Sequence, residues 1–180
     1  MIVLVDMDDV MADTSEYLYE TLMVRYPNVL EFKVPRKKFD IKDEYSFGNL
    51  LKVESVLYSL DFQSSIPPVK GSLDAVREIH KRGHDVVFCS TPHKYYETSV
   101  LQKYQWLENH LGKPFDRKLI LTEDKTLIRG DLLIDDKPEI NGLRFPSWEH
   151  ILFATSYNFH VDSRRRLYHW LDWKNVLSEL

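Results

Sequence analysis

Several features are scarce or absent in this sequence, and each of them excludes a class of function. Cys89 is the only cysteine in 180 residues, so no disulfide can form within the chain, as is usual in a reducing compartment. Lysine and arginine number 24 against 28 aspartates and glutamates, which leaves no basic excess for duplex nucleic acid. No apolar run approaches the roughly 20 residues of a membrane span, and no basic leader precedes the first apolar residues. We expect a cytoplasmic protein that binds neither polymeric nucleic acid nor membrane.

The residues that are present describe an ordinary globular protein. Apolar residues make up 43% of the sequence and charged residues 29%, and aromatic residues reach 13%. A chain of this length forms one domain with a proper core and has room for a small insertion. A single nucleotide remains a suitable ligand, because a few local cations are enough to hold one.

The first dozen residues hold the most informative stretch. Residues 2–5 are apolar and largely β-branched, and they are followed at once by Asp6 and Asp8. A short continuous apolar run predicts a buried parallel strand, whose carboxyl end opens into the crevice where α/β folds bind ligands. Two adjacent carboxylates repel each other unless a cation or a proton compensates. This stretch alone fits two interpretations equally well: an acidic turn that ends a strand, or a divalent metal site with one carboxylate free for chemistry.

Strands and helices alternate along the rest of the chain, except in one segment. Further strands are expected at residues 84–89, 118–122, 131–134 and 151–154. Helices are expected at residues 14–26, 72–82, 95–110 and 164–180. This rhythm predicts an α/β fold, a Rossmann-like parallel sheet flanked by helices. Residues 28–65 lack the rhythm and are rich in charge and aromatics, which indicates a small, mostly helical cap inserted into a core formed by residues 1–27 and 66–180.

Polar residues occur where four of the predicted strands end or shortly after. Because the carboxyl ends of parallel strands meet at one edge of a sheet, these residues are expected to converge on one rim. Each group alone is weak evidence, since a Ser-Thr pair is usually a turn and a lysine is usually solvated. Together they predict a phosphate site beside a metal site, formed by Asp6 with Asp8, Ser90 with Thr91, Lys125, and Asp135 with Asp136.

The charges suggest how these residues divide the work. An ionised Asp6 can attack phosphorus, and Mg²⁺ bound by Asp6, Asp135 and the backbone carbonyl of Asp8 offsets the repulsion between the two anions. Lys125 and the Ser90 hydroxyl are expected to hold the remaining phosphate oxygens. Asp8 is expected to protonate the leaving alcohol and then to activate water, which needs a raised pKa that the neighbouring acids could provide.

At these residues the sequence resembles a known family. An Asp-x-Asp pair, a Ser/Thr after a strand, a lysine and an Asp-Asp pair, in that order, resemble the haloacid dehalogenase (HAD) superfamily of phosphatases. The closer resemblance is to the 5′(3′)-deoxyribonucleotidases and covers nearly the whole chain, through VDMDDVMAD, VFCSTP, LTEDKTLIRGDLLIDDKPEI and PSWEHILF.

This resemblance implies a hydrolase that removes phosphate from deoxyribonucleoside monophosphates with Mg²⁺, and it suggests a homodimer. It also implies roles for the residues at matching positions. Asp6 is then the nucleophile and Asp8 the acid/base, and the metal ligands are Asp6, Asp135 and the Asp8 carbonyl, with Asp136 in a supporting position. The phosphate-binding residues are then Ser90, Thr91 and Lys125.

The cap supplies the predicted substrate contacts. Phe39 and Phe62 match positions of an aromatic base pocket in the related enzymes. From the residues alone they would form the small core of the cap, whereas the resemblance favours a stacking role for at least one of them. Lys94 follows the phosphate loop closely and either reaches the ligand or is a solvated residue at the start of a helix.

Four positions depart from the family pattern. Asp9 stands where a glycine is usual, and Thr14 and Asp40 stand where related enzymes tend to place aromatics. Glu123 occupies a position that is often arginine. These residues bear on base preference and on selectivity for deoxyribose, whereas every position of the phosphate chemistry is filled.

Three other functions fit parts of the pattern. The first is a HAD phosphatase for another small phosphate ester, a choice that the cap decides. The second is a non-catalytic phospho-acceptor like a response-regulator receiver, in which the acceptor Asp ends a middle strand and precedes the Ser/Thr and the Lys. Here the second acidic pair, Asp135 with Asp136, follows both, and an inserted cap has no place in a receiver. The third is a degenerate nucleotide-binding protein, which the complete set of catalytic positions disfavours. The nucleotidase ranks first.

Overall fold

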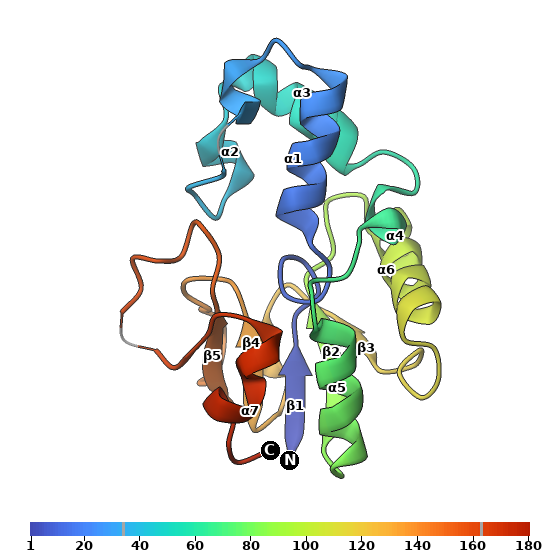
Figure 1. Cartoon of the computed structure of the whole chain (residues 1–180), viewed down its shortest axis with the longest axis vertical. Helices are drawn as coiled ribbons and strands as arrows, with labels where there is room; N and C mark the ends of the chain where they lie inside the picture. The colour runs from blue at the N-terminus through green and yellow to red at the C-terminus, as the bar shows by residue number, and fades with distance from the viewer. Residues whose placement is uncertain (34, 163) are drawn as a thin grey trace.

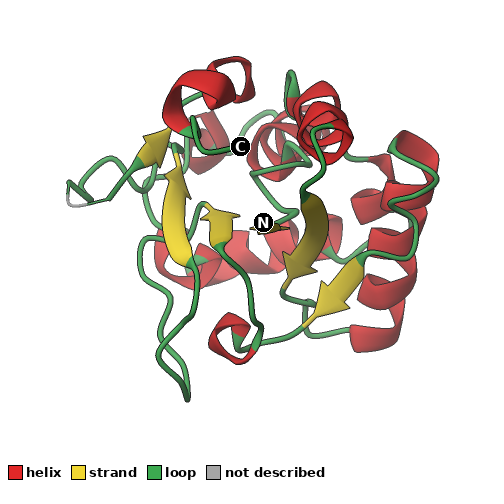
Figure 2. Cartoon of the chain, turned by 90° about the horizontal axis from the view of Figure 1, so that it is seen from below, coloured by secondary structure: helices red, strands yellow, loops and turns green. Residues whose placement is uncertain are grey.

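The computed structural model describes residues 1–33, 35–162 and 164–180 and contains one six-stranded parallel sheet. The strand order is β3-β2-β1-β4-β5-β6, so β1 lies inside the sheet with β2 and β4 as its neighbours. Figure 2 shows the row of strands with helices on both sides. The predicted α/β fold is therefore confirmed. The strands are β1 (Ile2–Val5), β2 (Asp85–Ser90), β3 (Leu119–Leu121), β4 (Leu132–Asp135), β5 (Glu149–Phe153) and β6 (Arg166–Leu167).

The helices gather around the sheet and above its carboxyl edge. In Figure 1, α1 rises from the sheet and packs against α3 above it, α2 adjoins α3, and α5, α6 and α7 lie beside the strands. The α-helices are α1 (Thr14–Arg25), α2 (Ile41–Glu44), α3 (Phe47–Leu57), α4 (Phe62–Ser65), α5 (Ser72–Lys81), α6 (Tyr96–His110) and α7 (Trp173–Val176). Short 3₁₀ turns are η1 (Leu30–Lys33), η2 (Lys125–Leu127) and η3 (Trp170–Asp172).

Both faces of the sheet are buried, which explains why its strands read as continuous apolar runs. Because side chains alternate along a strand, Val3 and Val5 of β1 face the larger core cluster, which α1, α5 and α6 help to form. Leu4 faces the opposite side, where it joins Cys89 and Trp148 in a smaller cluster covered by loops. Burial raises the pKa of the Cys89 thiol to about 11, so this cysteine is an inert core residue.

The predicted closing helix at residues 164–180 is wrong. The chain instead adds β6 to the sheet edge, with the Leu152 backbone N–H donating to Arg165 O at 2.9 Å, and then forms η3 and the short α7. Trp170 is buried, and its indole N–H donates to Val10 O at 2.7 Å. The apolar spacing that suggested a long helix reflects side chains that pack on the sheet from an irregular segment.

Residues 28–65 are mostly helical, as predicted, and we call them the cap. They contain η1, α2, α3 and α4; α3 packs against α1, and α4 packs against α6 of the core. The exact division between core and cap stays a prediction. Among the described helices, none is long and apolar enough to cross a membrane.

Candidate active site

The site begins where β1 ends. Register pairs Val5 with Ile134 of β4, so Asp6 and Asp135 occupy equivalent positions on adjacent strands. The Asp6 backbone N–H donates to Ile134 O at 2.9 Å, and the chain then folds into a tight loop. Asp9 adopts the left-handed conformation in this loop, with φ +58°. Glycine takes this conformation freely and aspartate tolerates it better than most residues, so Asp9 can occupy this position of the loop.

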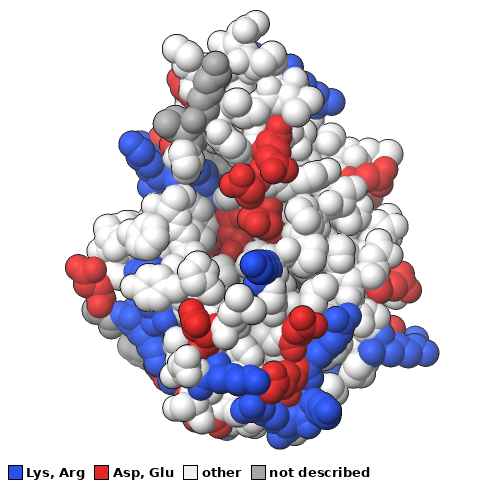
Figure 3. All heavy atoms as spheres, viewed as in Figure 1, with Lys and Arg blue, Asp and Glu red and all other residues white. Residues whose placement is uncertain are grey.

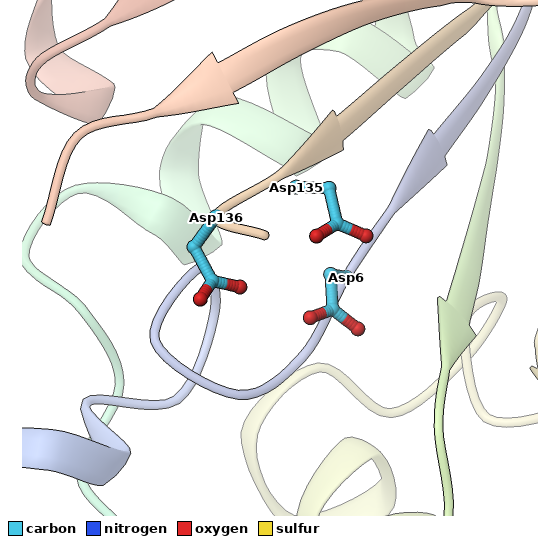
Figure 4. Close-up of side chains that lie close together, drawn as sticks. All are labelled: Asp6, Asp135 and Asp136. Atoms are coloured by element: carbon cyan, nitrogen blue, oxygen red, sulfur yellow. The ribbon is translucent and has the colours of Figure 1, made fainter. Parts of the chain in front are cut away.

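Three buried carboxylates form an acidic cluster at this edge of the sheet (Figure 4). Asp6, Asp135 and Asp136 each offer an oxygen, and these oxygens all lie within 4.8 Å of one another. Burial raises the pKa of Asp6 to about 6, with Lys125 opposing the shift and Asp135 adding to it. Burial and the neighbouring carboxylates Asp135, Asp6 and Asp9 raise the pKa of Asp136 well above its usual range. Such a cluster calls for a cation.

Lys125 supplies one positive charge inside the cluster. Its Nζ lies 2.7 Å from Asp6 Oδ1 and 2.5 Å from Asp135 Oδ2, and its side chain is only 8% exposed. Burial disfavours the charged amine, but Asp135 and Asp6 outweigh it and hold the pKa of Lys125 above its ordinary value. The η2 turn fixes the lysine, because the Asp124 side chain accepts a hydrogen bond from the Thr126 N–H at 2.9 Å. The predicted convergence of Lys125 with the acids is therefore present.

Two buried oxygens of the site accept or donate no hydrogen bond within the described residues. One is Ser90 Oγ, at the end of β2, and the other is Asp6 Oδ1, which contacts Lys125 without hydrogen-bond geometry. Asp6 Oδ1 is charge-paired with Lys125, whereas the Ser90 hydroxyl lines the cavity and is able to hydrogen-bond a polar ligand there. Thr91 is exposed and lines the same cavity.

Asp8 is held by two donors that come from different helices. Lys103 of α6 is 2% exposed, and its Nζ donates to Asp8 Oδ2 at 2.5 Å. The Thr14 hydroxyl at the start of α1 donates to Asp8 Oδ1 at 2.9 Å. Burial would raise the pKa of Asp8, but Lys103 outweighs it and the pKa lies below its usual value. The prediction that neighbouring acids raise this pKa is therefore wrong.

A cavity of about 490 Å³ lies between the cap and the acidic cluster. Figure 3 shows acidic side chains gathered in a hollow in the middle of this face of the molecule. The core side of the cavity is lined by Asp6, Asp8, Ser90, Lys125 and Asp135, and the cap side by Arg36, Phe39, Asp40, Leu50 and Tyr58. Its volume suits a small-molecule ligand.

A sequence model of the family described as 5′ nucleotidase, deoxy (pyrimidine), cytosolic type C matches residues 1–179. The chain belongs to this family. It is 42% identical to the human cytosolic-type 5′(3′)-deoxyribonucleotidase, over 98% of this chain and 92% of the human one. The mouse mitochondrial 5′(3′)-deoxyribonucleotidase is 38% identical, over 98% of this chain and 84% of the mouse one. Membership makes the chain a phosphoric monoester hydrolase and excludes the non-catalytic phospho-acceptor.

Solved structures agree on the fold. A HAD family hydrolase of Deinococcus radiodurans, solved with bound phosphate and sodium, aligns with a TM-score of 0.58 at 11% identity. The alignment covers 99% of this chain and 95% of that one. At this identity the likeness concerns the fold, which is the HAD-like fold predicted from the sequence.

Of the three residues predicted to contact substrate in this nucleotidase family member, one lines the cavity and two lie outside it. Phe39 lines the cavity, and its ring meets Tyr157 edge-on with centroids 5.8 Å apart. Phe62 is buried outside the cavity against Tyr17, with centroids 5.1 Å apart, and the next residue, Gln63, lines the cavity instead. Lys94 lies outside the cavity and pairs with Glu54 of the cap at 2.9 Å.

The departures from the family pattern also lie at the cavity. Thr14, Asp40 and Glu123 all line it, so they contact the space that a substrate would fill. Asp40 also caps α2, because its side chain accepts from the Lys42 N–H at 2.9 Å. Gln63 adds a further polar side chain to the lining, beside the aromatic side chains of Phe39 and Tyr58.

Lys103 is the main site residue that sequence reasoning missed. It lies 95 residues from Asp8 in a helix that reads as amphipathic, where a lysine normally faces solvent. The available signal was its neighbourhood: α6 carries Trp106 and Leu107 on its buried face, three and four residues after Lys103. A lysine on the apolar face of a helix needs a buried anion.

We expect Lys103→Met to lower kcat/KM about 100-fold, because it leaves Asp8 without the cation that keeps it ionised and oriented. The side chains have similar length, so the helix face stays filled. Steady-state kinetics of the purified variant give the answer, with the exposed Lys81→Met as a matched control. A loss below about threefold, or an equal loss in both variants, would show that Lys103 does not act through Asp8.

Proposed function

We propose that the chain is a Mg²⁺-dependent 5′(3′)-deoxyribonucleotidase that hydrolyses deoxyribonucleoside monophosphates through a phosphorylated Asp6. Family membership and the deoxyribonucleotidase activity after which the human and mouse relatives are named support the substrate class. The observation that carries the chemistry is the buried Asp6 carboxylate, which pairs with Lys125 at 2.7 Å and belongs to the acidic cluster with Asp135 and Asp136. The cytosolic type of the human relative supports a cytoplasmic location as part of the same proposal.

The residues at the acidic cluster fit a magnesium ion. Mg²⁺ is a hard cation that binds carboxylate, carbonyl and water oxygens, and the cluster offers only oxygen donors besides Lys125. Asp6, Asp135 and the backbone carbonyl of Asp8 would hold the ion, with Asp136 in support. When bound, it offsets the negative charge of the phosphate and of the carboxylates.

In the first half-reaction, a carboxylate oxygen of Asp6 attacks phosphorus and the ester P–O bond breaks. Lys125 and the Ser90 hydroxyl contact the phosphate oxygens, where negative charge redistributes in the transition state. The leaving alkoxide takes a proton through Asp8. Because Lys103 and Thr14 keep resting Asp8 ionised, this proton must be acquired before or during substrate binding.

In the second half-reaction, water attacks the phosphorus of phospho-Asp6 and the bond between phosphorus and the Asp6 oxygen breaks. Asp8 takes the proton from this water, which returns Asp6 as a free carboxylate and releases inorganic phosphate. The ionised Asp8 is the form that this step needs, and Lys103 and Thr14 orient it.

The phosphate chemistry is common to the superfamily, so the cavity must select the substrate. Phe39 and Tyr58 offer aromatic faces, while Thr14, Asp40 and Gln63 offer hydrogen-bonding groups. A phosphatase for another small ester remains the second candidate, because three polar residues replace part of the expected aromatic pocket. The proposed homodimer stays a prediction.

The test is phosphate release from a panel of nucleoside monophosphates, deoxy and ribo, 5′ and 3′, with Mg²⁺ or with EDTA. We expect release from deoxyribonucleoside monophosphates with Mg²⁺ and at least about a 100-fold loss with EDTA, because charge offset by a metal contributes several kcal/mol. An aryl phosphate is the control. Release from the aryl phosphate but from no nucleotide would assign the cavity to a different ester.

A further inference from the structure

Arg36 extends from the cap into the core. It lies beside the loop after β1 that carries Asp6, Asp8 and Asp9, which we call the catalytic loop. Its guanidinium lies 3.1 Å from Asp9 Oδ2, and the two side chains are only 12% and 8% exposed. The Ser156 hydroxyl donates to the Arg36 backbone carbonyl at 2.5 Å, so the core also holds the main chain of the cap at this residue. Because both side chains are buried, removing either one would leave an unpaired charge in the interior, which is strongly destabilising.

Tyr157 extends the contact to the metal side of the site. The Arg36 guanidinium lies over its ring, 4.3 Å from the centroid. Its hydroxyl lies within hydrogen-bond distance of Asp9 at 2.7 Å and of Asp136 at 2.5 Å. One buried group of side chains therefore joins the cap, the loop after Asp8, and the acid that follows Asp135.

The same buried group of side chains also supports the cap side of the cavity. Phe39, three residues after Arg36, lines the cavity and packs edge-on against the Tyr157 ring. Across the cavity, the cap also meets the core through Lys94 and Glu54, but these side chains are 47% and 24% exposed. Surface pairs contribute little, so the buried Arg36 contact is the stronger attachment.

We propose that Arg36, Asp9 and Tyr157 form a latch that fixes the cap over the acidic cluster and sets the position of Phe39 against the substrate. All three are positioning residues, since they act through the cap and the catalytic loop. The latch depends on the proposed function in one respect, namely that the substrate held by the cap is a nucleotide. A small aryl phosphate fills only the part of the cavity next to the acidic cluster, so its hydrolysis depends less on the cap.

The kinetic test compares Arg36→Ala with Asp9→Gly and with the double variant. Glycine adopts φ +58° without strain, so Asp9→Gly removes the carboxylate while keeping the loop. Asp9 also accepts from the Ser15 N–H and hydroxyl, both at 2.6 Å, so the Arg36 variants give the primary reading. We expect Arg36→Ala to lower kcat/KM for the best nucleotide about tenfold, mostly through KM, and the aryl phosphate value by less than twofold.

The remaining variants separate a latch from general damage. In the double variant we expect no further loss beyond the larger single effect, because each substitution breaks the same contact. Arg36→Lys should recover part of the activity on nucleotides. Lys38→Ala is the matched control, because this cap lysine is exposed and its side-chain amine donates to Asp43 O within the cap. Equal losses on both substrates, multiplicative losses in the double variant, or an equal effect of Lys38→Ala would overturn the proposal.

A second measurement does not depend on the substrate. We expect Arg36→Ala to speed amide hydrogen exchange in α2 and α3 at least about threefold, while exchange in β1 and β4 stays unchanged. Unchanged exchange in the cap would overturn the latch. If the wild-type enzyme hydrolyses the aryl phosphate but no nucleotide, the proposed function fails, and the exchange result still decides whether the latch exists.

Discussion

The Asp6→Asn variant is expected to lose at least about 10⁴-fold in kcat/KM on every phosphate ester, because an amide cannot replace the carboxylate as nucleophile. The substitution is nearly isosteric, so the buried site stays filled. Steady-state kinetics measure the loss. Asp13→Asn is the matched control from the same loop, and we expect its activity to stay within about twofold of wild type. Substantial residual activity in Asp6→Asn would contradict the assignment of the nucleophile.

The same variant also carries a stability prediction with a definite sign. Folding raises the pKa of Asp6 from 3.8 to about 6, so the folded state favours the protonated carboxyl. That contribution to stability is full below pH 3.8 and is lost as pH rises through about 6. Without metal, the difference in stability between Asp6→Asn and wild type should therefore move in favour of the variant by about 3 kcal/mol across this window.

Thermal or denaturant unfolding in EDTA, at several pH values from about 4 to 7.5, measures this difference. Asp13→Asn is again compared, since burial and Asp9 raise the pKa of Asp13 as well, but less markedly. If the stability difference does not change with pH, Asp6 titrates normally in the folded protein. That result would contradict the claim that burial raises its pKa.

The Lys125→Met variant has the second-largest expected effect, a loss of about 10³-fold in kcat/KM. The lysine contacts the phosphate in the proposed mechanism, and removing one such charge in a buried site typically costs two to three orders of magnitude. It also leaves Asp6 and Asp135 buried without their shared cation, so we expect about 3–5 kcal/mol of destabilisation in EDTA.

A metal titration separates the two roles of Lys125. Mg²⁺ should raise the melting temperature of Lys125→Met more than that of wild type, because the bound ion supplies the missing positive charge. Lys118→Met is the control, since the side chain of this lysine pairs with Asp85 at 3.4 Å, at the other end of β2 from the site. Wild-type activity in Lys125→Met, or equal metal stabilisation in both proteins, would contradict the assigned charge balance.

The sequence predicted the polar rim because strand geometry alone determines it. Apolar runs that end in Asp6, Ser90 and Asp135 identify both the strands and their carboxyl ends, and parallel register then brings the ends together. The same local reasoning predicted a mostly helical segment at residues 28–65, and the structure is mostly helical there. The predicted strands agree with β1 to β5 to within a few residues, whereas the predicted helix at residues 164–180 was wrong, because its apolar spacing belongs to β6, η3 and α7.

Long-range contacts were not predictable in this way. Lys103 reverses the direction expected for the Asp8 pKa, and nothing near Asp8 in the sequence signals it. In the cap, one residue decides whether a side chain faces the cavity or the core, so Phe62 is buried and Gln63 lines the cavity. The Arg36–Asp9–Tyr157 latch joins three distant segments and depends on their packing.

The most direct test of the account is to identify the residue that carries the phosphoryl group during turnover. The enzyme is mixed with excess deoxyribonucleoside monophosphate, quenched with acid within the first turnovers, treated with borohydride and digested for mass spectrometry. We predict substrate-dependent conversion at position 6, where reduction of an acyl phosphate gives homoserine, and none in Asp6→Asn. A phosphoryl group on another residue would contradict the central claim, as would its absence when Asp8→Asn is used to slow hydrolysis of the intermediate.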